Sequence, residues 1–163
     1  MKTSRKLSPG ISLLALAMVC VAATAEDKNT LEMHAIVNSV DLKWTPILSG
    51  WEIAVVSGNP DEDGKPFTIR FHGKDGAKVP AHWHPIDENI TVLKGTFLVA
   101  TGEKYDEAQL KPMNAGSFMS MPKGMRHFAR AKGDTVIQAH GIGPFKINWV
   151  NPAEVVLPSG PQK

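Results

Sequence analysis

The chain has 163 residues, of which 42% are hydrophobic and 21% charged, and a formal net charge of +2. This length suits one globular domain built around one core. A single cysteine excludes an intramolecular disulfide, and the nearly balanced charge argues against a nucleic-acid or anionic-membrane partner.

The first 25 residues are typical of a secretory signal peptide. They combine a basic start (residues 2–6), an apolar run (11–23) and a small-residue cleavage signal ending at Ala25. The apolar run is too short to span a bilayer core. We therefore expect a secreted, periplasmic protein without stable membrane insertion. Cleavage would also remove Cys20 and three cations, leaving 15 basic against 16 acidic residues.

Downstream of the leader, short β-type segments alternate with turn residues. We expect strands over 34–40, 51–56, 66–72, 89–93, 96–100, 127–131, 135–140 and 145–150. Pro46 should interrupt the chain between the first two, because proline cannot donate to a strand ladder. Short strands at this spacing predict a β-sandwich or barrel. The expected domain spans 26–150, followed by a proline-rich tail over 151–163.

The connections between these strands are predicted from turn residues. Lys94-Gly95 reads as a hairpin turn, and residues 132–134 read as a second turn. Residues 102–111 fit either one short helix or a long polar loop.

Two histidines and a glutamate predict a metal site. His82 and His84 are two residues apart, so an extended chain directs both imidazoles to one face. Glu88 shares their parity, and a short irregularity at Pro85-Ile86 would return it to that face. Two neutral imidazoles and one carboxylate are ligands for a divalent first-row transition metal.

A second stretch supplies a third imidazole. Pro122 and Gly124 mark a tight turn, and His127 opens the strand that follows it. A histidine on a neighbouring strand would complete a site of three histidines and one glutamate.

These two stretches resemble the two sequence motifs of the cupin superfamily. The first reads G-x5-H-x-H-x3-E-x6-G from Gly76 to Gly95, and the second reads G-x5-P-x-G-x2-H from Gly116 to His127. The second motif usually ends in asparagine, where this chain has Ala131.

The resemblance implies an all-β, RmlC-like jelly-roll β-barrel of the small secreted monocupin type. It also implies one divalent metal ion held by His82, His84, Glu88 and His127. Ligand type alone leaves Mn, Fe, Zn, Cu and Ni open. The resemblance does not imply a reaction, because one fold hosts many chemistries.

Four protein ligands leave one or two coordination positions open for a small chelating substrate such as a diol, catechol or carboxylate. We therefore expect a metal-dependent oxidoreductase of dioxygenase type, with Glu88 as both ligand and catalytic base. Two alternatives stay open: a non-enzymatic periplasmic cupin that binds a small ligand or metal, and an oxygen-independent lyase or isomerase. A homodimer formed through open strand edges is also expected.

Four residues outside the motifs are weaker candidates. His140 is the best candidate to orient a liganded imidazole, Arg70 and Arg126 could bind a substrate carboxylate, and Tyr105 could donate a proton. For both arginines a solvated strand face is the favoured interpretation, and for Tyr105 a loop residue packed on the barrel. Strand parity further predicts an apolar pocket lined by Ile90, Val92 and Phe97.

Overall fold

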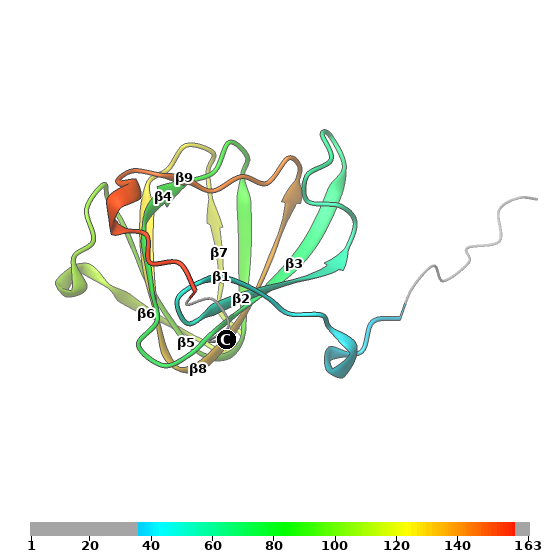
Figure 1. The fold of residues 1–163 in the computed structure, drawn as a ribbon, viewed down its shortest axis with the longest axis horizontal. Coiled ribbons are helices and arrows are strands. Elements are labelled where there is room, and N and C mark those ends of the chain that lie inside the picture. Colours follow the sequence, from blue (N-terminus) through cyan, green and yellow to red (C-terminus); the bar gives the residue numbers. More distant parts are fainter. Residues whose placement is uncertain (1–35, 159–163) are drawn as a thin grey trace, which may run out of the picture. The chain divides into compact units, whose positions relative to one another are not determined.

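A computed structural model describes residues 36–158, which belong to one compact unit. The predicted signal peptide lies outside the described residues and stays a prediction. Within the described range no helix is long and apolar enough to cross a membrane. Antiparallel strands make up most of this range and form a curled sheet (Figure 1). The prediction of an all-β jelly-roll barrel is confirmed.

The described residues form nine strands and three 3₁₀ turns. In chain order these are η1 (Ser39–Asp41), β1 (Thr45–Leu48), β2 (Trp51–Ser57), β3 (Pro66–Gly73), β4 (Lys78–Trp83), β5 (Glu88–Thr101), η2 (Glu107–Gln109), β6 (Lys111–Asn114), β7 (Phe118–Met121), β8 (His127–Ile142), β9 (Asn148–Trp149) and η3 (Pro152–Glu154).

Two long strands, β5 and β8, hold the barrel together because each takes part in both of its halves. The C-terminal half of β8 pairs with β3, and its N-terminal half pairs with β4. Strand β5 pairs with β8 along most of its length, and its other side pairs with β7 and then with β6. The same two strands therefore position both the core and the residues of the predicted metal site.

Bends rather than turns let these strands pass from one half to the other. The predicted hairpin at Lys94-Gly95 is wrong, because β5 continues to Thr101 with register shifts on both sides of Lys94. The predicted turn at residues 132–134 is likewise part of β8. Gly95 and Gly133 both have φ of 72°. An irregularity of register bends and twists a strand without ending its pairing.

The beginning of the domain also differs from the prediction. The described part of the expected strand 34–40 contains no strand and leads into the 3₁₀ turn η1. Pro46 lies inside β1 instead of interrupting the chain, and β1 pairs with β2 alone. An edge strand tolerates proline because its missing N–H donor is not required by a second neighbour.

The two segments predicted with least regularity are ordered by hydrogen bonds. Residues 102–111 contain the 3₁₀ turn η2, where the Asp106 carboxylate accepts a hydrogen bond from the Ala108 N–H, and end with Lys111, the first residue of β6. In the C-terminal segment, the Ser49 N–H donates to the Val156 carbonyl at 2.8 Å, which fastens this segment to the β1–β2 turn.

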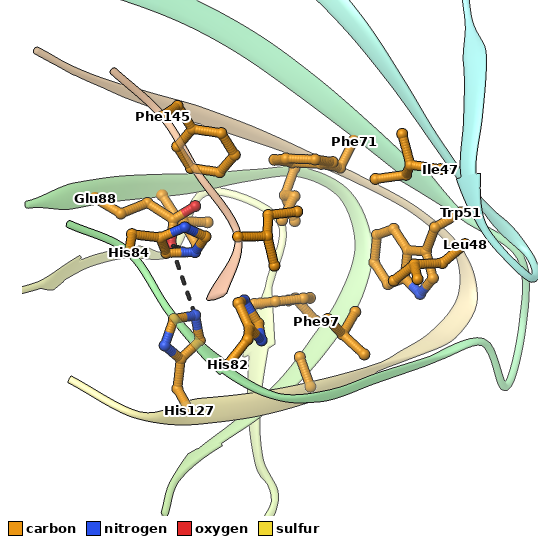
Figure 2. A pocket seen from close by; sticks show the side chains of 15 residues that line it. Ile47, Leu48, Trp51, Phe71, His82, His84, Glu88, Phe97, His127 and Phe145 are labelled. Carbon is orange, nitrogen blue, oxygen red and sulfur yellow. Dashed lines mark ion pairs between the residues drawn. The ribbon is translucent and has the colours of Figure 1, made fainter. Parts of the chain in front are cut away.

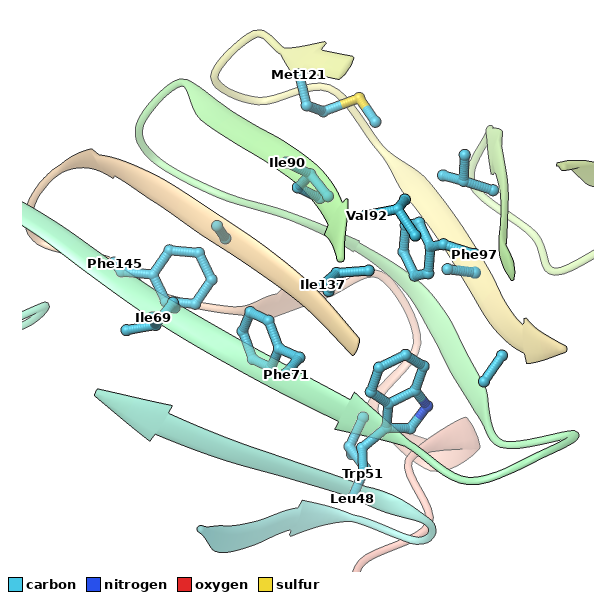
Figure 3. Close-up of a cluster of buried hydrophobic side chains, with 14 of the residues drawn as sticks. Leu48, Trp51, Ile69, Phe71, Ile90, Val92, Phe97, Met121, Ile137 and Phe145 are labelled. Atoms are coloured by element: carbon cyan, nitrogen blue, oxygen red, sulfur yellow. The ribbon is translucent and has the colours of Figure 1, made fainter. Parts of the chain in front are cut away.

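The core consists of buried apolar side chains in the barrel interior (Figure 3). Phe67, Ile69 and Phe71 all face it, which confirms the alternation seen in the sequence. Trp51 packs edge-on against Phe97, with ring centroids 6.2 Å apart. Burial of these apolar side chains is the main stabilising contribution available to a domain without disulfides.

Gly95 and Gly133 form a matched pair for testing the bend in β5. Both have positive φ, but a Cβ on Gly95 would lie 2.5 Å from the Asp134 carbonyl oxygen, whereas nothing lies within 4 Å of one on Gly133. We expect Gly133→Ala to lower the free energy of unfolding by about 1 kcal/mol, the cost of left-handed backbone. Gly95→Ala should cost at least about twice as much. Urea unfolding measures the free energy of unfolding of both variants. Equal decreases would show that the contact between a Cβ on Gly95 and the Asp134 carbonyl oxygen does not affect stability.

Candidate metal centre

The four predicted ligands meet at one end of the barrel (Figure 2). His82 lies on β4, His84 directly follows that strand, Glu88 begins β5 and His127 begins β8. The chain bends at Pro85-Ile86, between β4 and β5, as expected. All four side chains are buried, with exposed fractions of 6% or less.

Strand pairing brings the third histidine to the first two. His82 and His127 are direct cross-strand partners in the β4–β8 ladder, with ring centroids 4.1 Å apart. The potential ligand nitrogens of His82, His84 and His127 all lie within 4.8 Å of one another. This spacing allows one ion to contact all three imidazoles.

Backbone carbonyls fix the orientation of each ring. The Nδ1 atoms of His82 and His84 lie 2.8 Å from the carbonyl oxygens of Pro80 and Lys146, and Nδ1 of His127 lies 3.0 Å from that of Met125. A carbonyl oxygen only accepts, so each Nδ1 must carry the proton and donate it. Each Nε2 then carries a free lone pair, and this neutral tautomer is the form of histidine that binds metal.

Glu88 approaches the histidines from one side. Its Oε2 lies 3.4 Å from His84 Nε2 and 3.7 Å from His127 Nε2. It does not belong to the set of ligand atoms that all lie within 4.8 Å of one another. Glu88 therefore contacts two of the three imidazoles directly.

Two polar atoms of this cluster are buried without a hydrogen-bond partner in the described part of the chain: His84 Nε2 and Glu88 Oε2. Leaving such groups unpaired costs free energy, so they point to a partner that the polypeptide does not supply. A divalent transition ion satisfies both, since imidazole nitrogen and carboxylate oxygen are its usual ligands. The residues thus fit the implied metal.

Burial makes the metal-free cluster electrically neutral at pH 7. It lowers the pKa of all three histidines: that of His84 to about 4, and that of His82 well below its ordinary value with help from the neighbouring rings. The same desolvation raises the pKa of Glu88 to about 8. A bound cation would reverse the effect on Glu88, because an adjacent positive charge favours the carboxylate.

The loop that carries His84 is held against the turn that precedes β8. The Gly124 N–H donates to the His84 carbonyl at 2.8 Å, and the Lys123 N–H donates to the Asp87 carboxylate at 2.8 Å. On its other side the His84 ring stacks on Phe145, with centroids 4.5 Å apart. These contacts explain why both motif turns are needed to place one imidazole.

A cavity of about 50 Å³ extends from the ligands into the apolar interior. Ile90 and Phe97 line it, as strand parity predicts. Val92 does not line it and is buried in the core instead.

The weaker candidates lie elsewhere. His140 is exposed on the outer face, so the three carbonyls take the orienting role expected of it. Arg70 donates to Gln138, Arg126 pairs with Glu103, and Tyr105 packs on Phe128.

Two of the orienting carbonyls were recognisable in the sequence, because Pro80 and Met125 each precede their histidine by two residues. Lys146 is 62 positions from His84, and no local signal connects them.

Comparison with known proteins supports the cupin fold. The family model described as the ChrR cupin-like domain matches residues 32–146. The search of curated proteins found no match.

Solved structures with a similar fold differ widely in the activities their names give. The polyketide cyclase RemF from Streptomyces resistomycificus is 18% identical, with a TM-score of 0.61 over 75% of this chain and 89% of that chain. An RmlC-like cupin from Shewanella frigidimarina is 16% identical, with a TM-score of 0.55 over 66% and 88%. A salicylate 1,2-dioxygenase from Pseudoaminobacter salicylatoxidans, solved with gentisate, is 11% identical, with a TM-score of 0.50 over 61% and 29%. At these identities the likeness shows a shared fold.

The buried Glu88 predicts an unusual pH dependence for the metal-free protein. Between the ordinary glutamate pKa of 4.5 and its folded value of about 8, the folded state holds a proton that the unfolded state has lost. Stability therefore falls as pH rises through this window, by at most about 1.4 kcal/mol per pH unit from this group. We expect Glu88→Gln to become progressively more stable than wild type between pH 5.5 and 7.5, measured by urea unfolding in a chelating buffer. A difference that stays constant with pH would contradict the neutral carboxyl.

Proposed function

The chain belongs to the family of ChrR cupin-like domains, and from that premise we propose that it is a metal-dependent oxidoreductase of dioxygenase type. The observation that carries the proposal is the convergence of three imidazoles, each held with its Nε2 lone pair free, beside a buried carboxyl. The proposed metal is one divalent ion among Mn, Fe, Zn, Cu and Ni, of which Fe, Mn and Cu suit redox chemistry.

A metal held at this site would supply Lewis-acid and redox chemistry to a small chelating molecule and to oxygen. A dioxygenase reaction places both atoms of O₂ in the product, so it is balanced without a further electron donor. Glu88 has a second role in this proposal. A cation at the histidines would favour the ionised carboxylate of Glu88, which is the form that a general base requires.

The chain's own residues also keep water away from the reacting atoms. The four ligands are buried, and the cavity beside them is lined mostly by aliphatic and aromatic side chains. A dry site strengthens electrostatic interactions and limits hydrolysis of reactive species.

The small size of the cavity favours a second candidate, a non-enzymatic cupin that binds the metal or a small ligand. A cavity of about 50 Å³ leaves little room for two reactants beside the ligands. Secretion to the periplasm remains a separate proposal that rests on the sequence of residues 1–25.

Metal content and oxygen uptake test the site together. We expect wild-type protein, exported and purified without chelators, to contain about one transition ion per chain and to consume oxygen with a short aliphatic hydroxy acid, the kind of chelator that the small cavity admits. The double variant His82→Ala/His127→Ala should lose the ion, with an affinity at least about 100-fold weaker, because it removes two ligands. Elemental analysis and an oxygen electrode give the two readouts.

His140→Ala is the matched control, since it removes an exposed imidazole outside the cluster and should change neither readout. Stoichiometric metal without turnover of any kind would favour the binding protein. Turnover that continues under nitrogen would favour the lyase or isomerase. Folded wild-type protein without metal would contradict both metal-dependent enzymes and favour the cupin that binds a small ligand.

A homodimer is also proposed, because β6 and β7 each pair with β5 alone and leave one edge open. Phe118 on β7 is 58% exposed, and Leu93 on the neighbouring strand β5 is 42% exposed. We expect size-exclusion chromatography with light scattering at micromolar concentration to give twice the chain mass. Phe118→Lys should shift it toward the monomer without loss of fold. A monomeric wild type would reject the dimer.

A further inference from the structure

We propose that the ligand of this centre is a short molecule with a single polar head: an oxygen head that binds at the histidines, and an uncharged aliphatic tail of about two to four carbons. This inference rests on the proposed function, because the metal holds the head. The proposed function names small chelators in general as ligands. The present proposal narrows them to one chemical class, short aliphatic carboxylates and their close relatives.

The first support is the distribution of polar atoms in the cavity wall. The imidazoles and the Glu88 carboxyl lie at one end, whereas Ile47, Leu48 and Trp51 lie at the other (Figure 2). Between them the wall is built from aliphatic and aromatic side chains such as Phe71, Phe97 and Ile137. A molecule that fills this space meets ionisable groups at its head only.

The second support is the absence of a countercharge away from the ligands. No lysine or arginine lines the cavity within the described part of the chain. The remaining nitrogen of the wall is Trp51 Nε1, an uncharged donor, and Figure 2 shows it on the edge of the indole turned away from the histidines. A second carboxylate at that end would be buried without a partner, which costs several kcal/mol or more. Dicarboxylates are therefore excluded.

The third support is size. The cavity measures about 50 Å³, and one water-sized group needs roughly 10–15 Å³, so about four such groups fit side by side. A cavity that binds benzene measures about 150 Å³. A catechol or benzoate ring is thus too large, which narrows the range of substrates considered from the sequence.

The wall is also poorly placed to widen. Phe71, Phe97 and Ile137 lie on β3, β5 and β8, and each of these strands is hydrogen-bonded on both sides. Phe71 further packs on Phe145, with ring centroids 6.2 Å apart. Close-packed side chains on paired strands resist displacement, so the limit on size is built into the barrel.

A ligand series on zinc-loaded protein tests the proposal. Zinc binding is measured first by calorimetry, and the affinities of acetate, butanoate, hexanoate, benzoate and succinate are then measured by NMR titration. Each buried methylene contributes about a fourfold gain in affinity. We expect butanoate to bind about 15-fold tighter than acetate, and hexanoate, benzoate and succinate to bind at least tenfold weaker than butanoate.

Ala129 and Ala131 supply the matched variants. They are two residues apart on β8, and both are fully buried with 1% and 0% exposure, but only Ala129 lines the cavity. Ala129→Val should lower butanoate affinity at least fivefold and leave acetate unchanged, because it removes tail space and not the head site. Ala131→Val should change neither the butanoate affinity nor the acetate affinity. Where overpacking unfolds either variant, Ile137→Val is the substitute, and it should move the optimum to a longer chain.

The outcomes separate the two levels of the proposal. Equal affinities for acetate and butanoate on a zinc-loaded protein would overturn the aliphatic tail and leave the metal centre intact. Tighter binding of benzoate than of butanoate would overturn the limit on ligand size, and tighter binding of succinate would overturn the exclusion of a second charge. Either result would leave the metal centre intact. A wild type that takes up no zinc would overturn the proposed function, and the ligand class with it.

Discussion

The candidate metal centre depends on three hydrogen bonds from imidazole Nδ1 atoms to backbone carbonyls. The carbonyls of Pro80, Lys146 and Met125 fix which nitrogen carries the proton, and so leave three Nε2 lone pairs facing one point. Side chains could not perform this task as rigidly, since a carbonyl within a sheet or a tied loop has no rotamers of its own. The ligand geometry is therefore a property of the barrel backbone.

The same burial that organises the candidate ligands leaves two of their polar atoms without a partner in the described part of the chain. Desolvation lowers the pKa of the histidines and raises that of Glu88, which removes charge from the cluster and leaves His84 Nε2 and Glu88 Oε2 unpaired. A divalent ion offers each of these atoms the partner that the polypeptide lacks. Affinity for metal and the cost of burying polar groups thus have one physical origin.

The barrel also sets what can reach the ion. Strands β5 and β8 run through both halves and carry ligands at their first residues and apolar wall residues further along. Residues of the same two strands would consequently contact both the head and the tail of a ligand. Members of this fold with different named activities, such as a cyclase and a dioxygenase, share the scaffold. A shared fold therefore does not fix the reaction, which depends on the residues of the site.

The sequence by itself determined the fold class and indicated the candidate ligands. The spacing of His82, His84 and Glu88 needs only strand parity and one local bend, and the motif turn places His127 at a strand start. The sequence did not determine that β5 and β8 continue through Gly95 and Gly133, because a glycine can bend a strand or end it, and only pairing with neighbours decides which.

The partner of His84 and the size of the cavity also required the tertiary structure. Lys146 reaches His84 across 62 residues, and the volume between walls on β3, β5 and β8 is fixed by packing that no local pattern encodes. Local chemistry therefore identified the ligands, and long-range packing decided how they are oriented and what fits beside them.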